Sequence, residues 1–481
     1  VAGFVLTARG VAPSRAWVPG LVFGTGFYFV LIFWMRAVGT DAWVALAALE
    51  ASFYGILGAL NAVLTKHRWW PLWTAAAWVT IETWRSSWPF SGMPWGRLAF
   101  ATVDTPVASS LPYVGATGVS FLLALAGSVL AWLVVTQGRA RLVPAVGLVA
   151  LGVLIAVPAS APYEPTPDDH ATVAAVQGDV PGAGDDILLD FRQVTENHVR
   201  ATIDLADDVE AGRTPRPDFV IWPENSTAVD PFTDPTTNAG IRAASAAIDV
   251  PILVGAIVDA GPHYVLNQGI VWDPVTGGGD RYTKWHPVPY GEYIPFRRFF
   301  SGNFGRLAVI PRDMLSGTRT EPLTIDGVEV ADAICFDVAY DDGIYAQVTR
   351  GAQMLTVQTS NATFIHTDQI DQQFAISRLR AIETGRYVVV AATNGVSGVI
   401  TPDGEVVDRA GVRSRAVLVE RIGLDSAITP AVRIGSWSGR LFLGLMVLGL
   451  VLGLLPYRGN RQTARADRAP RRPVLAVTPS E

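Results

Sequence analysis

Long runs of apolar residues fill most of the first third of the chain, and another such run lies near its end. About 20 apolar residues, rising about 1.5 Å each, cross a hydrocarbon core of about 30 Å. The runs therefore predict six membrane-spanning helices, five of which precede residue 163: 16–35, 42–65, 69–84, 105–138, 142–162 and 437–456. We take the apolar residues that begin at Val1 as the end of a further, incomplete helix.

Residues 163–436 follow a different pattern, in which short β-branched runs alternate with helical stretches. Such alternation is typical of helices packed against a buried sheet. We therefore expect a separate α/β domain, preceded by membrane helices in 1–162 and followed by one in 437–456. The predicted strands are 172–178, 218–224, 251–257, 267–273, 328–336, 353–360 and 387–393. The predicted helices are 187–210, 238–247, 344–350 and 369–386.

The composition agrees with a membrane protein that carries a folded polar domain. Half of the 481 residues are hydrophobic, only 17% are charged, and the mean hydropathy is +0.30. These values exclude a disordered chain and differ from an ordinary soluble globule, in which about 25% of residues are charged. The net charge of −6 gives no reason to expect nucleic acid as a partner. Cys335 is the only cysteine, which excludes a disulfide framework and a cysteine-rich metal site. We expect neither a metal nor a cofactor.

The distribution of positive charge gives the spans an orientation. Residues 457–481 carry six arginines against Asp467 and Glu481, so the positive-inside rule places this Arg-rich tail in the cytoplasm. Alternation of the spans then puts six basic residues of the earlier loops inside and three outside. The same alternation places 163–436 on the extracytoplasmic face.

Three residues of the polar domain have the chemistry of a nucleophilic enzyme. Glu224 and Cys335 each end an apolar run that predicts a strand, and Lys284, the only lysine of the domain, lies between them in sequence. Sites in open α/β sheets form beyond the carboxyl ends of strands. A carboxylate there can take the proton of a thiol, and an ammonium can stabilise a thiolate and an oxyanion. The set is sufficient for acyl transfer through a thioester. Taken singly, the three residues are also typical of a buried thiol, a solvated carboxylate and a surface ammonium.

The sequence around these residues resembles one enzyme superfamily. The segments IWPEN, KWHPVPYGEYIPF and AICFD, which contain Glu224, Lys284 and Cys335, resemble the Glu-Lys-Cys triad of carbon–nitrogen hydrolases, or nitrilases. The spans and the segments SSWPFSGMPWGRLAF, VQGDVP, SNATF and TNGVSGVITPDGE narrow the resemblance to the apolipoprotein N-acyltransferase family of bacteria. The resemblance covers nearly the whole chain and implies a nitrilase-like α-β-β-α sandwich outside a membrane helix bundle.

The resemblance implies a ping-pong reaction at the bacterial cell membrane. Cys335 would take an acyl chain from a phospholipid as a thioester, and the α-amino group of a diacylglyceryl cysteine on an apolipoprotein would then accept it. Glu224 would be the general base, and Lys284 would stabilise the oxyanion. Glu292 and Asn361 match further functional residues of the family, although a loop-ordering glutamate and a turn asparagine fit these positions as well.

Asp337 departs from the family, whose members commonly have glutamate two residues after the nucleophile. On a continuing strand Asp337 projects to the same face as Cys335. Because a carboxylate there disfavours the thiolate, we expect Asp337 to orient Lys284 or a loop. The alternative is an ordinary capping aspartate.

Residues 293–314 interleave aromatic and basic side chains directly after the motif that contains Lys284 and Glu292. Aromatic rings suit the acyl boundary of a membrane, and arginines suit a lipid phosphate. We therefore expect a lipid clamp or lid over the site, with a hydrophobic contact to the domain's own core as the alternative. The expected lipid-binding residues are Phe296, Arg297, Phe299, Phe300 and Phe304.

Two other functions use parts of the same pattern. A membrane-tethered amidase or nitrilase that acts on a small carbon–nitrogen substrate would need the same triad, but the spans and the Phe/Arg segment favour a lipid. The second alternative is a non-catalytic membrane scaffold or receptor. The departure from the family pattern at Asp337 is compatible with this alternative. Release of lysophospholipid would distinguish an N-acyltransferase from the amidase or nitrilase. A lipid thioester on Cys335 would exclude the non-catalytic scaffold or receptor.

Overall fold

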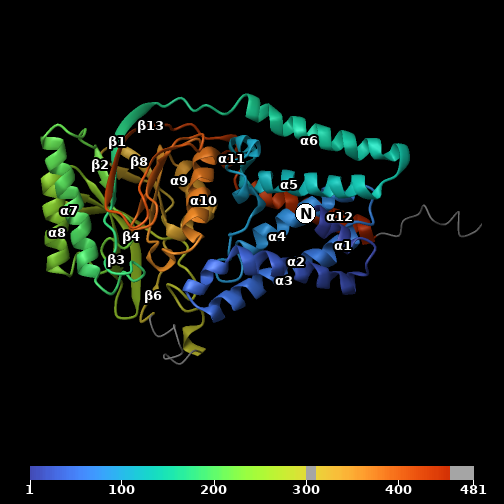
Figure 1. Cartoon of the computed structure of the whole chain (residues 1–481), viewed down its shortest axis with the longest axis horizontal. Helices are drawn as coiled ribbons and strands as arrows, with labels where there is room; N and C mark the ends of the chain where they lie inside the picture. Colours follow the sequence, from blue (N-terminus) through green and yellow to red (C-terminus); the bar gives the residue numbers. More distant parts are fainter. Residues whose placement is uncertain (300–309, 455–481) are drawn as a thin grey trace, which may run out of the picture.

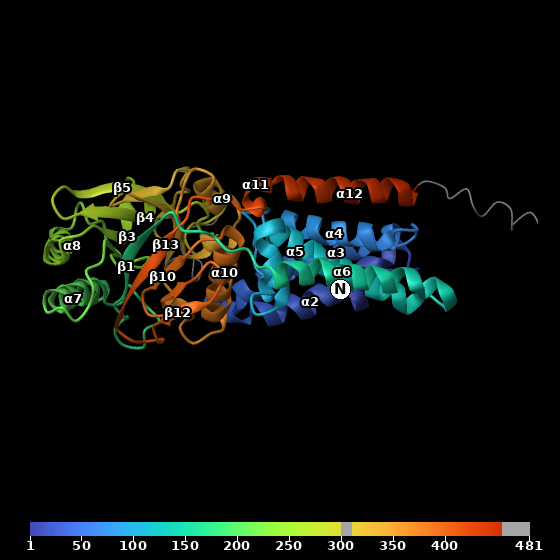
Figure 2. The same cartoon turned by 90° about the horizontal axis from the view of Figure 1, so that it is seen from above.

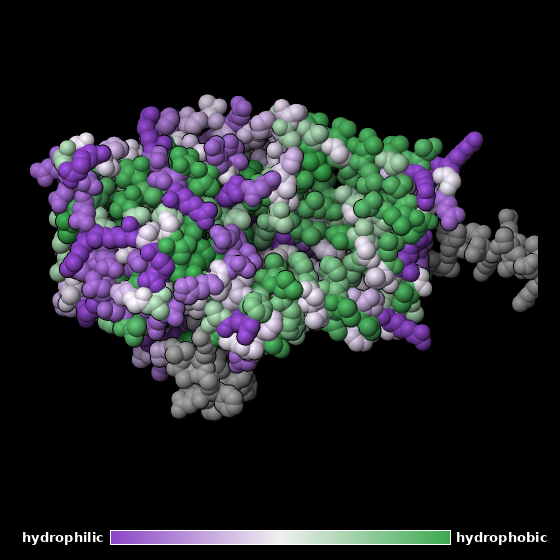
Figure 3. All heavy atoms as spheres, viewed as in Figure 1, coloured by the Kyte–Doolittle hydropathy of each residue, from purple (hydrophilic) through white to green (hydrophobic). Residues whose placement is uncertain are grey.

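The computed structural model describes residues 1–299 and 310–454. A layered α/β domain and a bundle of long helices lie next to each other along the long axis (Figure 1, Figure 2). Hydrophobic residues gather over the bundle, whereas hydrophilic residues cover much of the α/β domain and reappear at the far end of the bundle (Figure 3). Phe300, Phe304, the side chain of Phe299 and the predicted tail at 457–481 lie outside what the structure describes.

Each predicted span coincides with a helix of the bundle. In the described part of the chain, four helical stretches are long and apolar enough to cross a membrane: Thr40–Leu64, Pro106–Val135, Gly138–Ser160 and Trp437–Leu454. Helices α2 and α4, with 19 and 16 residues, are not among these four, so their crossing stays a prediction. The bundle helices are α1 (Ala2–Ala8), α2 (Pro13–Leu31), α3 (Thr40–Leu64), α4 (Trp70–Arg85), α5 (Leu111–Val135), α6 (Leu142–Ser160) and α12 (Trp437–Leu454).

Helices α2 and α3 pack closely because small residues lie where they cross. A Cβ atom on Gly20 would lie 2.2 Å from the carbonyl oxygen of Tyr54, and one on Gly58 would lie 2.4 Å from that of Ala16. Small residues let membrane helices approach closely, and van der Waals packing then drives their association.

The α/β domain has two stacked sheets between two layers of helices, which confirms the predicted α-β-β-α sandwich. The first sheet has the order β13-β1-β2-β3-β4-β5, with β6 beside β4, and the second has the order β12-β11-β10-β9-β8-β7. Strands β1, β2 and β3 run parallel, as do β8, β9 and β10, so the carboxyl ends within each set share one edge. Helices α7 (Phe191–Glu210) and α8 (Pro235–Ile248) cover the first sheet, and α9 (Asp342–Val348) and α10 (Gln369–Thr384) cover the second.

All seven predicted strands are present, and the structure adds others. Strand β5 escapes prediction because its sequence, GGGDRYT, lacks an apolar run. The strands are β1 (Asp169–Gln177), β2 (Phe219–Ile221), β3 (Ile252–Asp259), β4 (Tyr264–Asp273), β5 (Gly277–Thr283), β6 (Asp313–Met314), β7 (Leu323–Ile325), β8 (Val328–Ile334), β9 (Met354–Thr359), β10 (Val388–Ala392), β11 (Gly398–Ile400), β12 (Val406–Arg409) and β13 (Ala416–Leu424).

Helix α10 lies between the second sheet and the bundle, and polar contacts attach bundle loops to it. The side-chain oxygen of Gln372 accepts hydrogen bonds from the indole nitrogens of Trp34 at 3.0 Å and Trp95 at 2.6 Å. Farther along α10, Oε1 of Glu383 accepts the backbone N–H of Ala116 at 2.6 Å, next to a break in α5. One helix of the domain is thereby bonded to three segments of the bundle.

We expect Gly20→Ala to lower the Tm of the purified protein, because the added methyl group meets the carbonyl of Tyr54 and pushes α2 away from α3. Overpacking of this kind costs about 1–3 kcal/mol. Gly26→Ala is the matched control in the same helix, since nothing lies within 4 Å of a Cβ atom there. Thermal unfolding in detergent compares the two variants. Equal Tm values would contradict the tight α2–α3 contact.

Candidate active site

Three strands deliver the predicted catalytic residues to one place. Cys335 directly follows β8, Lys284 directly follows β5, and Glu224 lies three residues beyond β2. The ammonium nitrogen of Lys284 is 3.2 Å from Oε1 of Glu224, and the charges of both residues act on the thiol of Cys335. The fold thus assembles a carboxylate, an ammonium and a thiol that are far apart in sequence.

Lys284 lies between two carboxylates. Its side chain is 1% exposed, and its Nζ is also 2.6 Å from Oε1 of Glu292. The other oxygen of Glu292 accepts the backbone N–H of Val288 at 2.8 Å. Burial lowers the pKa of Lys284, but the charges of Glu224 and Glu292 outweigh burial and hold this pKa well above its usual value. Lys284 therefore stays charged at neutral pH, and Glu292 contacts it directly.

Three donors fix the buried carboxylate of Glu224. Besides Lys284, the side-chain amide of Asn267 donates to Oε1 at 2.8 Å, and the backbone N–H of Ser360 donates to Oε2 at 2.8 Å. A carboxylate anchored through both oxygens is well positioned to act as a base. The sequence does not reveal Asn267 or Ser360, because Asn267 lies within a mostly apolar strand and Ser360 contributes only its backbone.

Cys335 lies at a sharp turn of the backbone. Its φ is 54°, where β8 ends and a short 3-10 helix, Cys335–Ala339, begins. This left-handed conformation is uncommon for a residue other than glycine, and such strain often lies at functional sites. Burial and the charge of Glu224 raise the pKa of Cys335 to about 12, although Lys284 opposes them. The thiol is therefore protonated at neutral pH and needs a base when it attacks.

Asp337 ties the segment after the nucleophile to the segment around Lys284. Its buried carboxylate accepts the hydroxyl of Tyr282 at 3.0 Å and the backbone N–H groups of Trp285 at 3.1 Å and His286 at 2.9 Å. Burial raises the pKa of Asp337, but its contact with His286 outweighs burial and lowers this pKa. Asp337 thus orders the chain on both sides of Lys284, which is the geometry expected of a loop-orienting carboxylate.

The ring of His286 completes this contact. Its Nδ1 is 3.2 Å from Oδ1 of Asp337, and its Nε2 is 3.3 Å from Oδ2 of Asp342. One face of the ring stacks on Tyr340 with 3.7 Å between the ring centres. Burial lowers the pKa of His286, but the two carboxylates raise it to about 9. His286 is therefore a cation at pH 7.

Asn361 is buried beside the site but not bonded to the triad. Its amide nitrogen is 3.5 Å from the side-chain oxygen of Gln369, and a Cβ atom on Gly395 would lie 2.2 Å from its Oδ1. The loop after β9 therefore packs tightly, and the preceding residue of the same loop, Ser360, holds Glu224. The supporting role of Asn361 stays a prediction.

The predicted lipid-binding residues within the described segment differ in their surroundings. Phe296 is 62% exposed, and its ring centre is 5.8 Å from that of Phe90 in a bundle loop. Arg297 instead pairs with Asp313 at 2.5 Å inside its own segment. Phe296 stays a candidate for contact with an acyl chain, whereas a phosphate would have to displace Asp313 from Arg297.

Ion pairs centred on the partly buried Asp341 attach the turn of the nucleophile to the bundle. The guanidinium of Arg380, fully buried on α10, donates to the carbonyl oxygens of Val338 at 2.8 Å and Ala339 at 2.9 Å. It also lies 2.8 Å from Asp341, whose two oxygens accept hydrogen bonds from Arg97 of the bundle at 2.8 and 2.9 Å. The end of the 3-10 helix that begins at the nucleophile is thereby fixed relative to the helix bundle.

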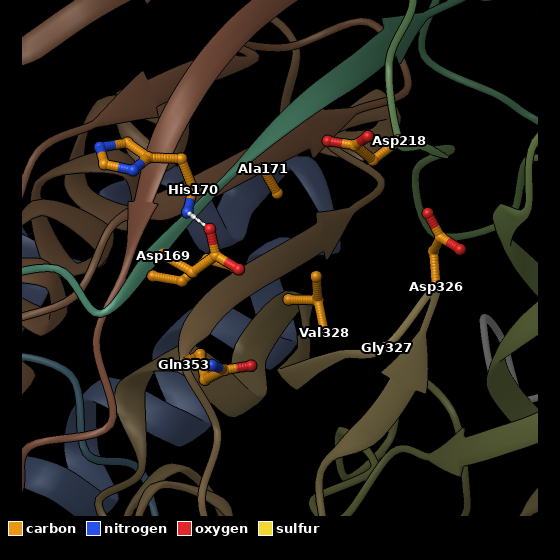
Figure 4. Close-up of a pocket in the computed structure, with 9 residues that line it drawn as sticks. Asp169, His170, Ala171, Asp218, Asp326, Gly327, Val328 and Gln353 are labelled. Carbon is orange, nitrogen blue, oxygen red and sulfur yellow. Dashed lines mark hydrogen bonds between the residues drawn. The ribbon is translucent and has the colours of Figure 1, made fainter.

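A separate hollow lies at the opposite edge of the sheets (Figure 4). Asp169 and Asp218 stand where β1 and β2 begin, whereas Glu224 and Cys335 follow the ends of strands. The carboxylates of Asp169 and Asp218 accept backbone N–H groups of β1 at 2.8 and 2.6 Å, so they stabilise the starts of strands. Among the described residues, no group of three His, Cys, Asp or Glu side chains could hold a metal ion.

Known families match the two parts of the chain separately. Residues 1–129 match the apolipoprotein N-acyltransferase N-terminal domain, and residues 172–429 match the carbon-nitrogen hydrolase family. The fold and the site therefore define a carbon–nitrogen hydrolase domain joined to a bundle that contains several helices apolar enough to span a membrane.

Relatives that match nearly the whole chain show to which family within this class the chain belongs. The chain is 37% identical over 485 residues to the apolipoprotein N-acyltransferase of Mycolicibacterium smegmatis, with coverage of 96% of this chain and 81% of that protein. It is 29% identical over 454 residues to that of Methylococcus capsulatus, with coverage of 89% and 85%. A solved mutant amidase from Nesterenkonia sp. AN1 is 17% identical, with a TM-score of 0.38 and coverage of 53% and 92%. The chain belongs to the apolipoprotein N-acyltransferase family.

We expect His286 to make the stability of the α/β domain depend on pH. A histidine has a pKa of about 6.5 in an unfolded chain, whereas Asp337 and Asp342 raise the pKa of His286 to about 9 in the folded protein. The stabilising contribution is therefore complete below about pH 6.5 and is lost as the pH rises through about 9. The Tm of the wild-type protein should fall across this range.

Asp342→Asn tests the cause of this dependence. Loss of one carboxylate should lower the pKa of His286 in the folded protein, so the fall in Tm should still begin near pH 6.5 but should be smaller and end at a lower pH. Asp207→Asn, which removes an exposed carboxylate from α7, is the matched control and should leave the profile unchanged. Identical profiles for Asp342→Asn and the wild type would contradict the ion pair.

Proposed function

We propose that this chain transfers an acyl chain from a membrane phospholipid, through a thioester on Cys335, to the α-amino group of the diacylglyceryl cysteine of apolipoproteins. The observation that carries the proposal is the contact of Lys284 with Glu224 and Glu292 beside the only cysteine, on a domain bonded to membrane helices. Membership of the apolipoprotein N-acyltransferase family supports a phospholipid donor and a lipoprotein acceptor.

In the first half-reaction the thiol of Cys335 attacks the ester carbonyl of the phospholipid. Glu224 takes the thiol proton as the S–C bond forms, and Lys284 stabilises the negative charge on the carbonyl oxygen. When the ester C–O bond breaks, the glycerol oxygen takes the proton from Glu224. A lysophospholipid leaves, and the acyl chain remains on the sulfur.

In the second half-reaction the α-amino nitrogen of the lipoprotein attacks the thioester carbonyl. Glu224 takes a proton from this nitrogen as the amide bond forms, and Lys284 again stabilises the oxyanion. The C–S bond then breaks, and the sulfur takes the proton from Glu224, which restores the free enzyme. Glu292 is a positioning residue in both halves, because it holds Lys284 in place and keeps it charged.

The α/β domain is placed on the extracytoplasmic side in this proposal. The positive-inside rule supports this orientation. The loops at the bundle end opposite the domain, 9–15, 65–69 and 136–141, contain no acidic residue. Their basic residues are Arg9, Arg15, Lys66, Arg68, Arg139 and Arg141.

We expect Cys335→Ala to abolish both half-reactions, because the chain has no other thiol. Cys335→Ser should be nearly as inactive, since a hydroxyl is far harder to deprotonate than a thiol. The assay supplies a phospholipid with a labelled acyl chain and a synthetic diacylglyceryl peptide, and it measures lysophospholipid and acylated peptide. A variant with wild-type Tm provides the folding control. Acyl transfer by Cys335→Ala at the wild-type rate would refute the mechanism, and amide hydrolysis without lysophospholipid release would favour a tethered amidase.

Cysteine labelling tests the orientation in a Cys335→Ala background. Glu210→Cys at the exposed end of α7 should react with a membrane-impermeant maleimide in intact cells. Arg139→Cys at the opposite end of the bundle should react only after the membrane is opened. Labelling of both positions from the same side would contradict the proposed topology.

A further inference from the structure

A hollow lies at the end of the bundle farthest from the α/β domain. It has a volume of about 280 Å³ and forms where the end of α1, the turn between α3 and α4, and the end of α5 meet. Helix α4 begins here and ends about 24 Å away, where it approaches the domain. The hollow is therefore remote from the Glu-Lys-Cys site. Its lining residues are Arg9, Thr65, Lys66, His67, Arg68, Trp70 and Trp132.

Three cations line this hollow without an acidic partner. Arg9, Lys66 and Arg68 are all exposed. In the part of the chain that the structure describes, no carboxylate forms an ion pair with any of the three. No acidic residue lines the hollow, so the positive potential there is left for a ligand.

Aromatic side chains set the positions of these donors. The guanidinium carbon of Arg9 is 5.8 Å from the centre of the Trp70 ring, and that of Arg68 is 5.2 Å from the Trp69 ring. Such stacking restrains a guanidinium but leaves its N–H groups available. Nδ1 of His67 accepts the indole N–H of Trp73 at 2.9 Å, which makes Nε2 the protonated nitrogen and a further donor.

The position of the hollow beside the hydrophobic surface of the helices indicates that its ligand is a lipid. Hydrophilic residues gather at this end of the bundle, directly beside the hydrophobic surface of the helices (Figure 3). Trp69 and Trp132 stand at this boundary with their ring centres 6.1 Å apart, as interfacial tryptophans do. A phosphate at this depth belongs to a lipid headgroup whose acyl chains continue along the helices, and basic pockets between membrane helices suit such headgroups.

We propose that this hollow binds the phosphate of an anionic phospholipid in the leaflet opposite the α/β domain. A zwitterionic headgroup is a poorer ligand, because its ammonium would approach the three cations. The bound lipid is distinct from the acyl donor, since no reacting group of the enzyme lies at this end. Its place between α1, α3, α4 and α5 stabilises the packing of the bundle.

Native mass spectrometry of the full chain in detergent tests the proposal by titration with phosphatidylglycerol or phosphatidylcholine. The wild-type protein should retain one phosphatidylglycerol in preference to phosphatidylcholine. The variant Arg9→Gln/Lys66→Gln/Arg68→Gln should bind it more weakly, by about fivefold for each cation removed. Arg139→Gln/Arg141→Gln is the matched control, because it removes two cations from the same end of the bundle outside the hollow. The control should retain the lipid as the wild type does.

Thermal unfolding and competition with inorganic phosphate test the same proposal independently. Phosphatidylglycerol should raise the Tm of the wild type and of the control variant, but not that of the triple variant. Inorganic phosphate at the same concentration should not displace the lipid. Equal lipid binding by the triple variant and the wild type, equal loss in the control, or displacement by inorganic phosphate would each overturn the proposal.

Discussion

A lysine side chain stays charged in a buried place only when carboxylates lie against it, and at Lys284 two carboxylates meet this requirement. Glu224 lies just beyond the end of β2 in the first sheet, and Glu292 lies in the loop that follows Lys284. Loss of one partner from a buried pair typically costs about 3–5 kcal/mol, so the three segments hold one another in place. Burial, together with the charge of Glu224, raises the pKa of Cys335 to about 12, so its thiol is protonated at neutral pH even though Lys284 opposes this shift.

The site lies on the side of the domain that faces the helix bundle. Arg380 and Asp341 fix the turn of the nucleophile to Arg97 of the bundle. The ring of Phe336, the residue after Cys335, stacks on Trp95 of the bundle with 5.9 Å between ring centres. The bundle is therefore part of the support of the nucleophile, which suits an enzyme whose donor ester lies at the boundary of a bilayer.

The sequence reveals the parts of this arrangement that depend on local pattern. Apolar runs predict helices because the thickness of a bilayer sets their length, and Glu224 and Cys335 are predictable because each follows an apolar strand. Lys284 is predictable because the domain has no other lysine and because its motif resembles the family. The pairing of the strands into two sheets rests on contacts between distant segments, and so does the pair of Arg97 with Asp341, which are 244 residues apart. A single sequence carries no local signal for such contacts, and the same holds for Asn267 beside Glu224.

The covalent intermediate is the most direct test of the account. Intact mass spectrometry of the purified full chain, incubated with a phospholipid of defined acyl chains and no acceptor, measures it. The proposed mechanism predicts that the protein gains the mass of one acyl chain, that hydroxylamine removes it, and that peptide mapping locates it on Cys335. An unmodified protein that still releases lysophospholipid, or an acyl chain on another residue, would contradict the central claim.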